Sequence, residues 1–509
     1  MKSIRIKNLR CFEDTGYIDI KPINLLVGLN STGKSSFARV FPLLKQSVER
    51  KISGAILWYG PYVDFGSYEE SVNRVTAANK NKPDNQICLG IETSLRLNRQ
   101  DPPENIRHES YITSDGDGNG QLELFKLSTD FFDIMFEFKG DVLVKISYND
   151  SIYIDERKGI ITSDGSLLPR PLFRWGGLDM LAYSPRYYRR NLQRSVNSRI
   201  ADRVLDCEKR ITEIIKPLFS HKSSDETIID GIQKLGVLTP STIFKRLSSV
   251  FSSQVVFIRN INKLTSEQIN EICSRTWLSH MELVIESIYE NHLKTCHSVK
   301  YVAPLRTTAE RYYRHQDFKY DEVDHKGENL PLVLQSLSNT EKLAFEEWTS
   351  QNFGFKIRVE KAGWQYAVKI KPNNDDQYTN ISDMGFGYSQ IAPIITSLWY
   401  EIHRNPKQSD RLIFVIEQPE LHLHPGYQAK FVDLVSKLHL FANKKGFDIN
   451  FIIETHSETI VNSLGKNITK GLINKNDASI LVFNKGVTKS YFDEDGFLVN
   501  WPTGFFEAY

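Results

Sequence analysis

An octapeptide at residues 28–35 constrains the fold of this chain more than any other feature. Its letters, Gly-Leu-Asn-Ser-Thr-Gly-Lys-Ser, fit the pattern GxxxxGK followed by Ser or Thr at every fixed position. The apolar stretch Ile23–Val27 precedes it and predicts a strand, and a 3.6-residue apolar period over Ser36–Val48 predicts a helix. A strand, a glycine-rich loop and a helix in this order indicate an α/β unit that binds phosphate.

The residue types of this loop match the chemistry of a phosphate chain. The two glycines let the backbone curl so that successive N–H groups face phosphate oxygens. The Lys34 side chain brings a positive charge to the β- and γ-phosphates, and the Ser35 hydroxyl can ligate Mg²⁺. The residues that we predict to bind the cofactor here are Asn30, Ser31, Thr32, Gly33, Lys34, Ser35 and Ser36.

Two further apolar strands end in acids. Leu412–Ile416 runs into Glu417-Gln418-Pro419-Glu420, and Phe451–Ile453 runs into Glu454-Thr455-His456. Ligands usually bind at the carboxyl ends of parallel strands, so we predict that Glu417 and Ser35 hold the metal ion. His456 would then reach the γ-phosphate or the attacking water, although a lone histidine is more often structural.

A fourth segment, Ser382–Gln390, is rich in serine and glycine and precedes an apolar helix expected over Ile391–Tyr400. Free N–H groups at a helix start form an anion site. The residues that we predict to face phosphate are Ser382, Gly385 and Gly387. The chain has a single GxxxxGK loop, so a second phosphate-facing loop suggests a dimer that sandwiches the nucleotide.

The middle of the chain has another character. Short alternating runs separated by Gly, Asp and Asn turns predict an antiparallel sheet from about residue 85 to 175. Helical periods follow, over Ile200–Phe219 and Ser266–Leu293. We therefore expect an α/β fold in which residues 1–84 and 301–509 form one domain and residues 85–300 form an inserted lobe, rich in β-strands and then helical.

The order of these motifs resembles ABC-type ATPases related to RecF, SMC proteins and the OLD nucleases. Three more segments, Asn8–Phe12, Pro304–Tyr312 and Asp495–Phe506, resemble standalone ATPases of bacterial anti-phage systems, such as the PtuA type of Septu and the AriA type of PARIS. This resemblance covers about residues 1–80 and 300–509. It implies an ABC-type ATPase head, ATP and Mg²⁺ as cofactors, a homodimer or higher oligomer through the heads, and an effector partner such as an HNH or Toprim-type nuclease.

The resemblance also implies roles for single residues. Glu417 would hold the metal ion, the next position would normally be a catalytic glutamate, residues 422–424 would cross the dimer, and His456 would be the switch. The next position here is Gln418, which has no titratable carboxylate and cannot act as a general base. Glu420 could replace it, although a loop hydrogen bond is the favoured interpretation of that side chain. The catalytic candidates are thus Gln418, Glu420 and His456, and we expect slow hydrolysis.

Contact with DNA is a weaker prediction. The run Arg186–Arg190, followed by Arg194 and Arg199, alternates cations with aromatic rings as single-strand-binding surfaces do, but a solvated helix face is at least as good an interpretation. A second basic cluster spans residues 306–314. A net charge of +2 gives the whole chain no strong pull toward nucleic acid.

Other classes fit less well. The acids Asp493–Asp495 are expected in a hairpin turn, and too few residues follow His456 for a Toprim nuclease domain, so any cutting activity is expected in a partner. A RecF-like repair clamp stays open as the alternative, and a nearly inert, ATP-stabilised scaffold that sequesters an effector is a third possibility. A transporter ATPase and a coiled-coil repair ATPase are poorer matches. Scattered cysteines, the lack of a long apolar run and a strand-like start, Ile4–Lys7, lead us to expect a cytoplasmic protein without membrane contact.

Overall fold

A computed structural model describes the chain except for ten segments, residues 75–85, 98–100, 149–150, 156–160, 163–165, 172–197, 307–308, 315–319, 405–410 and 502–509. The fold divides into two compact units. We call them the lobe (Met1–Ile6, Ile52–Ile56 and Gln86–Leu293) and the head (Lys7–Lys51, Leu57–Asn85 and Lys294–Tyr509). The predicted fold class, an α/β head built from both ends of the chain around an inserted lobe of strands and helices, is confirmed.

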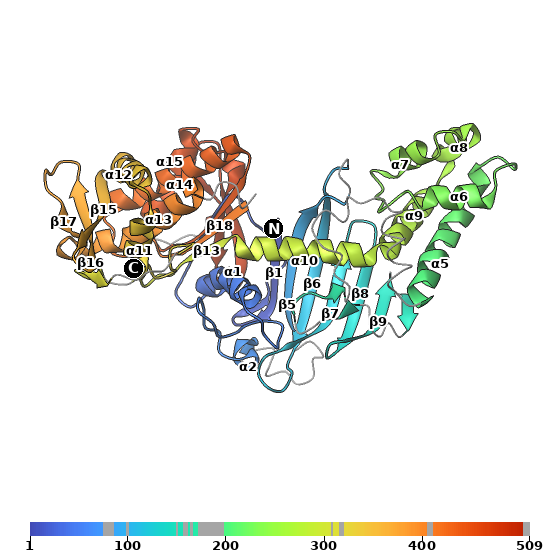
Figure 1. Cartoon of the computed structure of the whole chain (residues 1–509), viewed down its shortest axis with the longest axis horizontal. Helices are drawn as coiled ribbons and strands as arrows, with labels where there is room; N and C mark the ends of the chain where they lie inside the picture. Colours follow the sequence, from blue (N-terminus) through green and yellow to red (C-terminus); the bar gives the residue numbers. More distant parts are fainter. Residues whose placement is uncertain are drawn as a thin grey trace. The chain divides into compact units, whose positions relative to one another are not determined.

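The head is organised around a seven-stranded sheet in the order β13-β18-β19-β4-β20-β21-β22. Figure 1 labels two of these strands, β13 and β18. The strands of the sheet are β13 (Val299–Val302), β18 (Arg411–Glu417), β19 (Asp448–Glu454), β4 (Ile23–Gly28), β20 (Ala478–Phe483), β21 (Val487–Phe492) and β22 (Leu498–Val499). The first five are parallel, and the last two add an antiparallel edge. β4 and β20 are buried along their whole length, as expected for a parallel sheet that is covered on both faces.

The head also contains the helices α1 (Lys34–Glu49), α2 (Tyr68–Ser71), α11 (Leu330–Ser336), α12 (Asn339–Phe353), α13 (Phe386–Arg404), α14 (Pro425–Lys445) and α15 (Glu458–Thr469). Of these, α1, α13 and α14 pack on the seven-stranded sheet. The helix α1 packs on β4, β13, β18 and β19, so it places the start of the glycine-rich loop against the strands that carry the acids. A second, antiparallel sheet of the head contains β14 (Tyr313–Arg314), β16 (Gln365–Pro372), β15 (Phe355–Ala362) and β17 (Thr379–Asn380).

The lobe contains the antiparallel sheet predicted for the middle of the chain. Its order is β12-β11-β9-β8-β7-β6-β5-β1, with β10 paired to β9, and β1 also pairs with β2 and β3. The bounds are β1 (Ser3–Leu9), β2 (Phe12–Asp14), β3 (Ile18–Asp19), β5 (Ile87–Leu95), β6 (Glu104–Thr113), β7 (Gln121–Ser128), β8 (Asp133–Lys139), β9 (Val142–Tyr148), β10 (Ser151–Asp155), β11 (Ile161–Thr162) and β12 (Arg170–Pro171). Alternate side chains of β8 are buried, so one face of the sheet carries the core.

Helices complete the lobe. They are α5 (Ser198–Ile215), α6 (Asp225–Ile232), α7 (Ile243–Val250), α8 (Val255–Asn260), α9 (Ser266–Ser279) and α10 (Met281–His297). The helical period predicted over Ser266–Leu293 is confirmed but is divided between α9 and α10, because the chain breaks at His280, whose φ and ψ are −117° and 23°. The apolar period hides this break, since Trp277 before it and Val284 after it are buried in the same core.

Candidate functional site

The glycine-rich loop joins β4 to α1 and requires its glycines. Gly33 precedes the first residue of α1 with φ 108°, in the left-handed region, and a Cβ there would lie 2.4 Å from the Cys11 sulfur. A Cβ on Gly28 would lie 2.5 Å from the backbone oxygen of Phe483. Any larger residue at these two positions would therefore force the loop out of its curled shape.

The side chain of Lys34 is buried and folded onto its own loop. Its Nζ donates to the backbone oxygens of Gly28 at 3.0 Å and Leu29 at 2.6 Å. Burial lowers the pKa of Lys34, and the carboxylates of Glu454 and Glu420 oppose that shift. The tip of the loop, including Asn30 and Ser31, is exposed. The predicted phosphate ligands thus lie at an open surface that has two carboxylates near its lysine.

The first acid of the second motif, Glu417, ends β18 and is fully buried. Arg39 of α1 donates to both of its carboxylate oxygens at 2.8 Å, and the Tyr301 hydroxyl donates to one of them at 2.7 Å. Buried Arg306 donates to the backbone oxygen of Glu417 at 2.8 Å. Burial lowers the pKa of Arg306 to about 10. The carboxylate that we predicted as a metal ligand is therefore held in a bidentate pair with a guanidinium.

A second buried acid, Glu454, ends β19 and contacts the glycine-rich loop directly. The Ser35 hydroxyl donates to its Oε1 at 2.7 Å, while its Oε2 is buried with no hydrogen-bond partner among the described residues. Burial, and secondarily the charge of Glu417, raise the pKa of Glu454 to about 7. The sequence reasoning missed this residue as a candidate. The signal was available, because Glu454 ends its strand as Glu417 ends the neighbouring one.

The three catalytic candidates lie on the two loops that follow these strands. Gln418 has φ 44°, and its backbone N–H donates to the backbone oxygen of Glu454 at 2.8 Å. Glu420 Oε1 accepts from the backbone N–H of His456 at 2.7 Å, which is the loop hydrogen bond favoured for this side chain. Its Oε2 is buried without a hydrogen-bond partner in the described part of the chain, and burial raises the pKa of Glu420. The ring of His456 is exposed.

The Ser/Gly segment differs from its prediction in one respect. The helix α13 begins at Phe386 and not at Ile391, so Gly387 lies in its first turn and only residues up to Gly385 form the loop. A Cβ on Gly387 would lie 2.8 Å from the backbone oxygen of His422, and this close approach accounts for the glycine. Ser382 and Gly385 are exposed. Within the described residues, no hydrogen bond, ion pair or ring contact joins residues 382–387 to residues 28–36.

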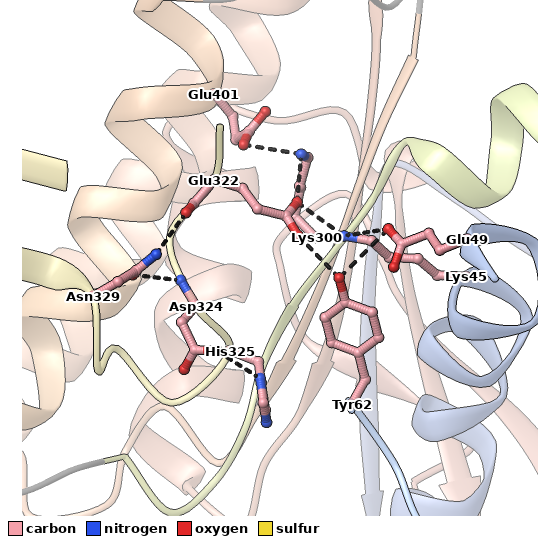
Figure 2. Close-up of polar contacts among 9 residues, drawn as sticks. All are labelled: Lys45, Glu49, Tyr62, Lys300, Glu322, Asp324, His325, Asn329 and Glu401. Atoms are coloured by element: carbon pink, nitrogen blue, oxygen red, sulfur yellow. Dashed lines mark hydrogen bonds and ion pairs between the residues drawn. The ribbon is translucent and has the colours of Figure 1, made fainter. Parts of the chain in front are cut away.

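A network of charged side chains lies beside α1 (Figure 2). Lys300 of β13 contacts Glu322 at 2.8 Å and Glu401 of α13 at 3.0 Å, and Lys45 of α1 contacts Glu322 at 2.8 Å. The Tyr62 hydroxyl donates to Glu322 at 3.1 Å. Tyr62 and Glu322 also line a hollow of about 800 Å³, so this end of the network reaches the surface. The network links the helix that follows the glycine-rich loop to the helix that follows the Ser/Gly loop.

Of the remaining predicted features, some lie outside the described residues, one basic cluster is partly buried, and one turn is confirmed. Residues 186–190 and Arg194 lie outside the described residues, as do Thr307, Thr308 and the end of the chain from residue 502. Arg306 is buried in the head and is not part of a basic surface, while exposed Arg311 pairs with Asp383 at 3.3 Å. The turn predicted at Asp493–Asp495 is confirmed, since Asp493 accepts from the backbone N–H groups of Asp495 and Phe497.

Two kinds of feature are absent from the part of the chain that the structure describes. No group of three or more His, Cys, Asp or Glu side chains there could hold a metal ion. Among the described helices, none is both long enough and apolar enough to cross a membrane.

Comparison with known proteins gave one family and several structures. The sequence model of a family described as "AAA ATPase domain" matches residues 1–166 and 181–461. No curated protein matches the chain. One similar solved structure is titled as a crystal structure of the SmcHead bound to the C-winged helix domain of ScpA, with 12% identity, a TM-score of 0.33, and 98% of this chain and 95% of that chain covered. Another is an SMC head domain from Thermotoga maritima, with 9% identity, a TM-score of 0.32, and coverage of 97% and 98%.

Proposed function

The chain belongs to the AAA ATPase domain family, and we propose that it binds ATP with Mg²⁺ between two copies of its head. In this proposal it hydrolyses the nucleotide slowly and controls a partner effector in anti-phage defence. The observation that carries the proposal is the loop from Gly28 to Ser35, with its left-handed Gly33 and with Lys34 at the start of α1.

Binding would reorganise the loop very little. The Lys34 ammonium now donates to two backbone oxygens of the loop, and a phosphate oxygen would be a stronger, charged acceptor within its reach. The backbone N–H groups at the start of α1 have no partners within the helix, so they are available to phosphate. Lys34 and these N–H groups would hold and orient the phosphate chain.

The donor set at this position fits a hard cation. Ser35 offers a hydroxyl, and Glu454 offers a buried carboxylate oxygen that no hydrogen bond satisfies among the described residues. Mg²⁺ is usually held by one or two protein oxygens together with substrate phosphates and water, so a dedicated cage of side chains is not needed. When bound, the ion supplies charge neutralisation at the phosphates.

Slow turnover follows from the residues around the attacking water. Gln418 can orient a water by hydrogen bonding, but it cannot accept a proton. Glu420 has one oxygen already bonded to the His456 backbone, and only its second oxygen is available. A site that binds the triphosphate well and removes the water proton poorly would keep the ATP-bound state for a long time.

The dimer rests on the Ser/Gly loop. Ser382 and Gly385 are exposed, and among the described residues no hydrogen bond, ion pair or ring contact connects their loop to the glycine-rich loop of the same chain. A second copy of the head could therefore bring this loop to the open face of the nucleotide. The defence role and the effector rest on the resemblance of segments such as Pro304–Tyr312, and the RecF-like clamp is the rival.

Measurements on the purified chain test the ATPase proposal. We expect ATP to raise the mass from monomer to dimer by light scattering, with turnover well below the roughly 1 per second at the low end of common enzymes. Lys34→Ala should abolish both effects. Gln418→Glu should raise the turnover about ten-fold or more, because it restores a general base. Fast hydrolysis by the unaltered chain would contradict the slow-turnover proposal.

The partner proposal needs a separate experiment. We expect the chain to copurify with the product of a neighbouring effector gene, and Lys34→Ala to change the effector's activity in cells challenged with phage. Preferential binding to gapped DNA by the isolated chain, without any such partner, would instead support the repair clamp.

A further inference from the structure

Two glutamates lie side by side at the carboxyl ends of adjacent parallel strands. Glu417 of β18 and Glu454 of β19 are register partners, and β19 lies between β18 and β4. Glu454 is therefore one strand closer to the glycine-rich loop, which continues from β4. Both acids end a strand near the loop, so position in a strand alone does not decide which of them binds the metal ion. Their hydrogen-bond contacts distinguish them.

Both carboxylate oxygens of Glu417 already accept hydrogen bonds. Arg39 donates to both carboxylate oxygens at 2.8 Å, and Tyr301 donates to one of them at 2.7 Å. A cation bound to this carboxylate would have to lie against the guanidinium or displace it. Arg39 belongs to α1, and its Nε and Nη2 form the parallel pair of hydrogen bonds that gives Arg–carboxylate pairs their fixed geometry.

The contacts of Glu454 are incomplete. Its Oε1 accepts from the Ser35 hydroxyl at 2.7 Å, and its Oε2 is buried without a hydrogen-bond partner among the described residues. Glu454 is 1% exposed, so this oxygen is shielded from bulk solvent. Lys34 and Arg39 lie near enough to influence the charge of Glu454, but neither forms a hydrogen bond with it in the described structure.

We propose that Glu454, together with Ser35, holds the metal ion that accompanies the nucleotide, and that Arg39 and Tyr301 keep Glu417 as an anchor of the site. The inference rests on the proposed binding of ATP with a divalent cation. Arg39 and Tyr301 are positioning residues in this scheme, since they act on the site through Glu417. The pair of a hydroxyl and one carboxylate agrees with the small number of protein ligands that Mg²⁺ needs beside phosphates.

The test of this assignment measures Mn²⁺ binding in the presence of a non-hydrolysable ATP analogue. The electron paramagnetic resonance signal of free Mn²⁺ reports the binding, and no turnover is needed. Glu454→Gln is expected to weaken Mn²⁺ binding about ten-fold or more, and Glu417→Gln less than about three-fold. The matched control is Glu458→Gln, which removes an exposed acid from the first turn of α15 and should leave Mn²⁺ affinity unchanged. The reverse order, with the larger loss in Glu417→Gln, would overturn the assignment.

Folding and nucleotide binding are followed in parallel. The Tm of each variant is measured, and Glu454→Asp is a second variant that keeps the charge but shortens its reach by one methylene. We expect Glu454→Asp to bind Mn²⁺ more weakly than the unaltered chain. In EDTA, without the metal ion, it should bind the ATP analogue as well as the unaltered chain does. Unchanged Mn²⁺ affinity in both Glu454 variants overturns the inference. If the unaltered chain binds no analogue, with or without Mn²⁺, the proposed function itself fails.

Discussion

At the scale of single residues, the available space around the glycine-rich loop limits which amino acids fit there as much as the chemistry of phosphate binding does. Gly33 combines a left-handed φ of 108° with a site for Cβ that Cys11 and Phe12 already occupy, at 2.4 Å and 2.8 Å. Gly140 has φ 59°, and a Cβ added there would meet nothing within 4 Å, so this position isolates the backbone cost alone. These two positions allow steric and conformational contributions to be separated.

Gly33→Ala should therefore destabilise the chain more than Gly140→Ala. We expect Gly140→Ala to lower the free energy of unfolding by about 1 kcal/mol, the usual cost of a left-handed alanine. Gly33→Ala should lower it by about 2 kcal/mol or more, since overpacking adds to the same backbone cost. Urea denaturation measures both, and equal losses would show that the loop yields to the added methyl group.

At the scale of elements, the ion network of Figure 2 connects α1, β13 and α13 through opposite charges. Burial disfavours the charge of Lys300, yet the carboxylates of Glu401 and Glu322 outweigh it and raise its pKa. Burial raises the pKa of Glu401, which Lys300 opposes. Lys300 thus neutralises two acids at once, and its removal would leave Glu401 buried without its cation.

Lys300→Met tests this connection. Breaking a buried pair by removing one partner costs about 3–5 kcal/mol, and the partial exposure of Glu322 reduces the expected loss here to about 2–3 kcal/mol. The control is Lys234→Met, just beyond the end of α6, where the pair with Asp230 is open to solvent and should contribute less than about 0.5 kcal/mol. Equal unfolding midpoints in urea for the two variants would mean that the network contributes little.

At the scale of the whole molecule, the histidines with the largest lowering of the pKa lie in the lobe, while burial also lowers the pKa of His403 and His456 in the head. His108 and His292 lie buried in the lobe with ring centroids 6.5 Å apart. Burial, with smaller contributions from His292 and the N-terminus, lowers the pKa of His108 to about 3, and burial lowers that of His292 to about 4. In the head, burial would raise the pKa of Glu322, but Lys300 and Lys45 outweigh it and hold that pKa at about 2.

Acid should therefore weaken the lobe before the head. The two histidines are neutral in the folded lobe, so their contribution is complete above about pH 6.5 and falls by about 1.4 kcal/mol per pH unit for each histidine below it. The contribution of Glu322 is complete above about pH 4.5 and is lost only as the pH falls toward 2. Amide hydrogen exchange at pH 7 and pH 5, corrected for intrinsic rates, should show lost protection in the lobe. Equal loss in the head would contradict this order.

Much of the fold could be predicted from local pattern. The apolar runs at residues 23–27, 412–416 and 451–453 lie in strands, because a strand buried on both faces favours a nearly continuous apolar run, interrupted here only by Asn24. The prediction missed the break at His280 and the start of α13. The spacing of apolar residues shows which face of a helix is buried. This spacing continues unchanged across a helix break when the helices on both sides pack on the same core, so the break at His280 leaves no sign in the sequence pattern.

The sequence by itself determined the glycine-rich loop, the strand that leads to it, and the glutamine that follows Glu417, since each depends on residues next to one another in the chain. Only the tertiary structure decided which acids are available. Arg39 and Tyr301, which engage Glu417, come from α1 and β13, and Ser35 and Glu454 lie far apart in sequence. Strand register brings these groups together, and a carboxylate's role depends on the partners that it meets there.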